Sequence, residues 1–115
     1  MSKLAKYLIS DLEGDSLKSS IKFFRSSGAY GYILWLTVVD NFYSEHSMTI
    51  DELVEKLEKY ASRRTILDFI SKGVDANFLE KKIFLDDKRK VLISPTDITI
   101  TEYKDWSDNF IKSIT

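Results

Sequence analysis

The chain has 115 residues, of which 43% are hydrophobic, 13% aromatic and 30% charged, a profile typical of one globular domain. It contains no cysteine, which excludes disulfide bonds and thiolate chemistry and favours a reducing, cytoplasmic location. The longest apolar run, YILWLTVV, is far shorter than the roughly 20 residues that a spanning helix needs, so we expect neither a membrane segment nor a secretion signal.

Charge is unevenly distributed along the chain, although the net charge is only -1. Residues 56–90 carry ten Lys and Arg against six Asp and Glu, a net charge of +4, whereas the remaining residues carry a net charge of -5. A basic segment inside an acidic chain indicates a localised anion-binding face. A merely solvated surface is the alternative explanation.

Helical periodicity dominates the first half of the chain. Residues 17–24 predict a second helix that ends at the SSG of 26–28, and residues 29–43, apolar nearly all round, predict a buried central helix. Residues 44–48 are expected to form a loop. A short first helix is predicted from apolar residues that recur at helical spacing: Leu4, Tyr7, Leu8 and Leu12.

Residues 49–77 are predicted to form two helices joined by a tight turn. Thr49 and Glu52 have the spacing of a capping box, and Ser62 is a good N-cap for the second helix. Asn77 can take the left-handed conformation after that helix. Gly73 is unfavourable inside it, by about 1 kcal/mol relative to Ala, for no reason visible in the sequence. The apolar stripe of the second helix comprises Ile66, Phe69, Ile70 and Val74.

Two β-prone runs, FLEKKIF and KVLIS, surround a charged tip at residues 86–90 and predict a hairpin over 78–96 that Pro95 closes. Apolar residues at helical spacing then predict a terminal helix over about 98–114. The expected fold is mainly α (α+β). It is a single winged helix-turn-helix domain over 1–115, with a C-terminal β-hairpin wing and flanking terminal helices.

In such units the second helix enters the major groove of DNA with its N-terminal residues at the base edges. Arg63 and Arg64 would lie in its first turn, where an arginine fork can grip guanine or straddle a phosphate. The hairpin tip would neutralise phosphates. The alternatives are a solvated helix start paired with Asp68 and a merely hydrophilic turn. The predicted DNA-binding residues are Ser62, Arg63, Arg64, Thr65, Lys72, Asp87, Lys88, Arg89 and Lys90.

Residues 49–96 resemble the MarR family of winged helix-turn-helix regulators. The family patterns T-(V)-x-E-L-A-x-x-L, S-x-x-T-V-x-R-x-V-x-x-L and D-x-R correspond to TIDELVEKL, SRRTILDFI and DDKRK. The turn after Leu57 is about two residues longer than in the family, and Asn77 and Gly73 replace a glycine and a core leucine. The resemblance implies base contacts from residues 62–65 and a wing whose Arg89, braced by Asp87, enters the minor groove.

The resemblance also implies a homodimer joined through the terminal helices, and it leaves a small-molecule effector open. Aromatic stripes on these helices have little of the domain left to cover them, and exposed patches of this kind usually mark an interface. The predicted dimerisation residues are Leu4, Tyr7, Leu8, Tyr103, Trp106 and Phe110.

No catalytic or metal-binding pattern is visible in the sequence. His46 is the only histidine, and no glycine-rich nucleotide motif is present. We therefore expect no cofactor, no metal and no enzymatic activity.

Three functions stay open. The first is a sequence-specific transcriptional regulator that binds double-stranded DNA. The second is a winged-helix module for protein–protein interaction, which the low sequence pI favours. The third is a DNA-binding component of phage or plasmid replication initiation, because SSGAYGYILWLTVVDNFY is similar to the opening helix of some primosomal winged-helix domains.

Overall fold

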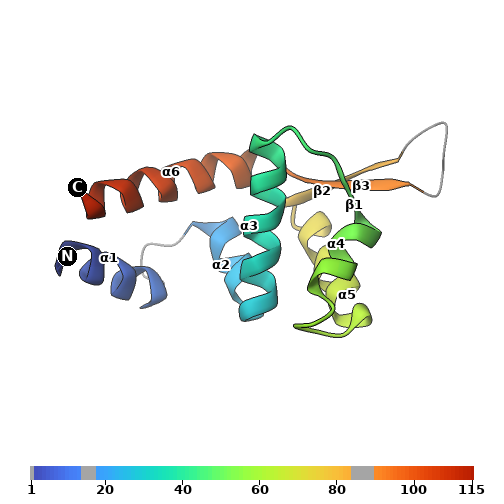
Figure 1. Ribbon diagram of the computed structural model, residues 1–115, viewed down its shortest axis with the longest axis horizontal. Helices are drawn as coiled ribbons and strands as arrows, with labels where there is room; N and C mark the ends of the chain where they lie inside the picture. Colours follow the sequence, from blue (N-terminus) through green and yellow to red (C-terminus); the bar gives the residue numbers. More distant parts are fainter. Residues whose placement is uncertain (1, 14–17, 84–89) are drawn as a thin grey trace.

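The computed structural model describes residues 2–13, 18–83 and 90–115, and the predicted order of helices and hairpin is confirmed (Figure 1). The mainly α winged-helix fold class is confirmed with it. The elements are α1 (Ser2–Glu13), α2 (Ser19–Arg25), α3 (Ala29–Tyr43), β1 (Met48–Thr49), α4 (Ile50–Leu57), α5 (Arg63–Asp75), β2 (Leu79–Ile83), β3 (Val91–Pro95) and α6 (Asp97–Ile114).

Helix α3 is the centre of the fold, as its apolar sequence predicts. In Figure 1 it stands between α1, α2 and α6 on one side and α4, α5 and the strands on the other. Leu34 and Trp35 on α3 are completely buried, and Ile66 and Ile70 bring the inner face of α5 to the same core. The helix-turn-helix is therefore attached to the rest of the chain through one continuous apolar cluster.

The strands form a three-stranded antiparallel sheet in the order β1-β3-β2. The predicted hairpin of β2 and β3 is present, with Leu79 opposite Pro95 and Ile83 opposite Val91. The expectation of a loop through residue 48 is wrong at its end, because β1 pairs Met48 with Ile93. A strand of two residues is too short to show an alternating pattern in the sequence. It is a strand only because it pairs with β3, far along the chain.

Local chemistry sets the ends of α4 and α5 as the sequence predicts. Thr49 and Glu52 form the complete capping box. The Ser62 Oγ accepts a hydrogen bond from the Thr65 backbone N–H at 3.2 Å. Asn77 takes a positive φ of 66° just after α5, which turns the chain into β2.

The structure explains Gly73, which the sequence left unexplained. A Cβ at this position would lie 2.8 Å from the Leu79 Cδ1 and 3.2 Å from the Phe23 Cε2. The missing side chain therefore lets β2 lie directly on α5, so that the wing begins beside the second helix of the helix-turn-helix. Within the described ranges, no helix has the length and apolar character needed to cross a membrane.

Candidate nucleic-acid interface

The first turn of α5 gathers four of the predicted DNA-binding residues on one exposed surface. Ser62, Arg63, Arg64 and Thr65 are all exposed. Besides its capping bond, the Ser62 hydroxyl donates to the Thr65 hydroxyl at 2.8 Å. The helix therefore begins with an ordered pair of hydroxyls beside two guanidinium groups, a combination that suits an anion at a helix N-terminus.

The two arginines differ in their surroundings. The Arg63 Nη2 lies 3.0 Å from the Asp51 Oδ1 of α4, and its Nη1 lies 3.7 Å from the Glu58 Oε1 just after α4. Arg64 forms no ion pair with any residue that the structure describes. Arg63 thus links the two helices of the helix-turn-helix, whereas the charge of Arg64 faces solvent.

The alternative explanation for the arginines, in which they pair with Asp68, is not what the structure shows. Asp68 instead pairs with Lys72 one turn later on α5, at 3.2 Å, and both side chains are well exposed. An exposed i, i+4 pair is worth only about 0.3–0.5 kcal/mol, so Lys72 can exchange this carboxylate for a phosphate at little cost. Lys72, Arg64 and Thr65 also border a groove between α5 and the turn that joins α2 to α3.

The wing is described only at its base. Asp87, Lys88 and Arg89 lie outside the described residues, so their contacts remain predictions. Lys90 is exposed just before β3. Lys81 and Lys82, which the predicted set omits, are exposed on β2, where successive side chains point to opposite faces of the sheet.

No family model and no curated protein matches this sequence, but solved structures do. A DNA complex of MepR from S. aureus superimposes with a TM-score of 0.60 and 11% identity, over 96% of this chain and 78% of that chain. The chain has a MarR-like winged-helix fold. The heme sensor PefR from Streptococcus agalactiae, in complex with heme, gives a TM-score of 0.56 and 16% identity over 96% and 75% of the two chains. The adhesin competence repressor AdcR from Streptococcus pyogenes gives 0.51 and 15% over 98% and 72%.

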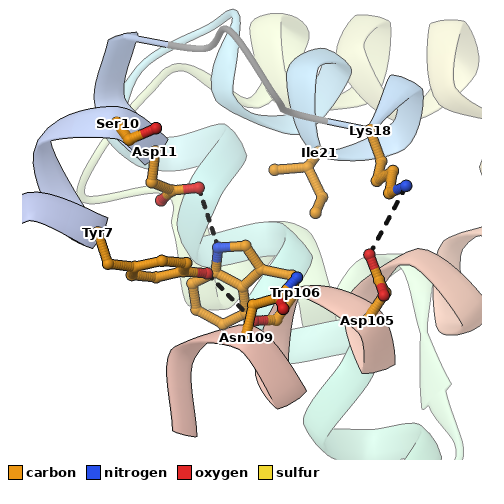
Figure 2. A pocket seen from close by; sticks show the side chains of 8 residues that line it. All are labelled: Tyr7, Ser10, Asp11, Lys18, Ile21, Asp105, Trp106 and Asn109. Atoms are coloured by element: carbon orange, nitrogen blue, oxygen red, sulfur yellow. Dashed lines mark hydrogen bonds and ion pairs between the residues drawn. The ribbon is translucent and has the colours of Figure 1, made fainter. Parts of the chain in front are cut away.

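The terminal helices of this winged-helix chain meet at a polar junction, shown in Figure 2. The Asp11 carboxylate, only 5% exposed, lies 2.8 Å from the Arg25 guanidinium and accepts a hydrogen bond from the Trp106 indole N–H at 3.1 Å. The Tyr7 hydroxyl donates to the Trp106 carbonyl oxygen, also at 3.1 Å. We call Tyr7, Asp11, Arg25 and Trp106 the α1–α6 junction.

Burial, and to a smaller extent the nearby Asp11 carboxylate, raise the pKa of the Tyr7 phenol to about 12. The phenol is therefore kept neutral and able to donate its hydrogen bond to α6 over the whole physiological pH range. This bond and the Asp11 pair together hold α1 on the rest of the chain.

The residues predicted for dimerisation are better covered within the chain than we expected. Tyr103 and Trp106 pack against Trp35 with ring centroids 5.6 and 5.3 Å apart, and Tyr7 meets Phe110 edge to face at 5.9 Å. Leu4 is half-buried and Leu8 is 39% exposed. The large apolar side chains that stay exposed on α1 and α6 are Leu8, Ile9, Leu12, Ile98, Ile111 and Ile114.

Sequence reasoning missed the carboxylates that hold the arginines. Asp51 could be recognised only as a favourable acid in the first turn of α4, and Asp11 only as part of a turn-like acidic stretch. Their partners are more than ten residues away, so no local signal identifies them. In the part of the chain that the structure describes, no three His, Asp or Glu side chains come together as metal ligands.

Proposed function

We propose that this protein is a sequence-specific transcriptional regulator of MarR-like type that binds double-stranded DNA. Helix α5 would enter the major groove, and the wing would lie on the minor groove or backbone. The observation that carries the proposal is the exposed first turn of α5, with the outward Arg64 on a helix that continues directly into a basic hairpin. The shared fold with MepR, whose structure is a complex with DNA, supports the same orientation.

The two arginines would have different roles. Arg63 is already shared between Asp51 and Glu58, so using it to read a base would first require leaving two exposed ion pairs, each worth at most about 1 kcal/mol. It would mainly hold α4 and α5 at their mutual angle. Arg64 needs no such rearrangement and presents its planar fork from the first turn, which suits guanine O6 and N7.

The test is selection of duplexes from a random pool, followed by measurement of affinity for the selected site. Arg64→Ala should lose about 1–3 kcal/mol of specific binding and relax the preference at one base pair. Lys112→Ala removes an exposed cation in the last turn of α6, away from α5 and the wing, and should leave the base preference unchanged. Equal affinity of Arg64→Ala and the parent would remove Arg64 from base recognition.

The proposal includes a homodimer built through α1 and α6. Exposed Leu8, Leu12 and Ile111 are apolar surface that a second copy could bury, and two-fold symmetry would set paired α5 helices in successive major grooves, about 34–36 Å apart. Light scattering at micromolar concentration, with and without DNA, measures the assembly directly. A monomeric mass under both conditions would contradict the dimer.

The same measurements separate the other functions. A protein-interaction module would show no salt-dependent affinity for duplex DNA. For a protein that binds phosphates, the logarithm of the binding constant falls linearly with the logarithm of the salt concentration. A replication-initiation component would prefer origin DNA to the DNA upstream of a regulated gene. A gel shift with the DNA upstream of the protein's own gene is the most direct first experiment.

A further inference from the structure

Helix α5 carries one large apolar side chain where the core does not need it. Its inner face comprises Ile66, Phe69, Ile70 and Gly73, all buried, whereas Leu67 is 37% exposed. At 100° per residue, Leu67 lies away from that inner face and one turn after Arg64. It is the only large apolar residue of α5 that is exposed.

The neighbours of Leu67 distinguish it from an ordinary surface leucine. Isolated apolar residues are common on protein surfaces and by themselves need no explanation. Here, however, Leu67 borders a shallow hollow with Arg63, Arg64 and Asp68. The hollow lies on the surface that the proposed function turns towards the bases, so it combines an arginine fork with an aliphatic side chain.

The major groove of DNA offers a matching apolar group. Among the four bases, only thymine presents a methyl group there, at C5, while the other edges are hydrogen-bond donors and acceptors. Burying one methyl group against an aliphatic side chain is worth about 0.8 kcal/mol, which corresponds to an increase in affinity of about fourfold.

We propose that Leu67 is a specificity-determining residue that recognises the 5-methyl group of a thymine. The proposal rests on the proposed function, because it assumes that α5 enters the major groove. Arg64 and Leu67 are separated by about 4.5 Å along the helix axis, against about 3.4 Å between base pairs. The thymine therefore lies one or two base pairs from the base that Arg64 reads.

The experiment replaces each thymine of the selected duplex, one at a time, by deoxyuridine, which lacks only the 5-methyl group. Binding of the parent should weaken about fourfold at one thymine in each half-site. Leu67→Ala should bind the unmodified duplex about as weakly as the parent binds the modified one, and it should show no further loss with deoxyuridine. Ile98→Ala, which truncates a similarly exposed residue on α6, should respond to deoxyuridine as the parent does.

The outcomes separate the two proposals. If no duplex is enriched by selection, both the proposed function and this inference are wrong. If a site is selected and depends on Arg64, but the parent is indifferent to every deoxyuridine, the proposed function stands and the role of Leu67 is refuted. A Leu67→Ala variant that keeps the full methyl dependence refutes it equally.

Discussion

Replacing Asp11 by alanine tests how firmly α1 is attached to the rest of the chain. The substitution removes the partner of the Arg25 guanidinium and the acceptor of the Trp106 indole N–H. Breaking a buried ion pair from one side costs about 3–5 kcal/mol, because the remaining charge loses its compensation.

Two features place the expected cost of Asp11→Ala at the lower end of this range. The Arg25 side chain is 18% exposed, so water can partly replace the carboxylate. Its guanidinium also keeps a hydrogen bond to the residue 11 carbonyl oxygen, at 3.1 Å, and lies 5.1 Å from the centre of the Tyr32 ring. We therefore expect a loss of about 3 kcal/mol in the free energy of unfolding.

Urea unfolding followed by circular dichroism measures this loss from the transition midpoint, provided that the slope is unchanged. Asp105→Ala is the matched control, because its pair with Lys18 spans 3.6 Å between side chains that are about half exposed. That substitution should cost at most about 1 kcal/mol. A double-mutant cycle with Arg25→Ala isolates the pair. The reasoning is refuted if Asp11→Ala is no less stable than Asp105→Ala.

Gly73→Ala should lower the free energy of unfolding by about 1 kcal/mol in the same assay, because crowding against Leu79 outweighs the gain in helix propensity. A variant more stable than the parent would contradict the packing argument. The Tyr7 phenol has its pKa raised from 10.0 to about 12, so its contribution to stability is present below pH 10 and lost as pH rises towards 12. Tyr7→Phe should reduce that alkaline loss and remove a late step from the ultraviolet titration, and an unchanged profile would refute the assignment. Lys90→Ala should flatten the log K against log salt slope by about 0.9 per subunit without changing the melting temperature, whereas Lys112→Ala should leave the slope as it is.

Elements whose boundaries depend on near neighbours could be predicted from the amino-acid sequence alone. The capping box of Thr49 and Glu52, the Ser62 cap and the left-handed Asn77 all involve groups within a few residues of each other. The hairpin and the helical stripes follow from periodicity in the same way. Caps and helical stripes depend on residues that are close in the sequence, and hardly on the rest of the fold. A sequence pattern is therefore enough to predict them.

Features that join distant parts of the chain became visible only in the folded structure. These include the pairing of Met48 with Ile93, the approach of Leu79 that requires Gly73, and the choice of Asp51 as the partner of Arg63. The α1–α6 junction brings Tyr7 to Trp106 across 99 positions. Such contacts depend on the path of the whole backbone. The sequence around a carboxylate or an aromatic ring is the same whether or not the fold brings a partner to it.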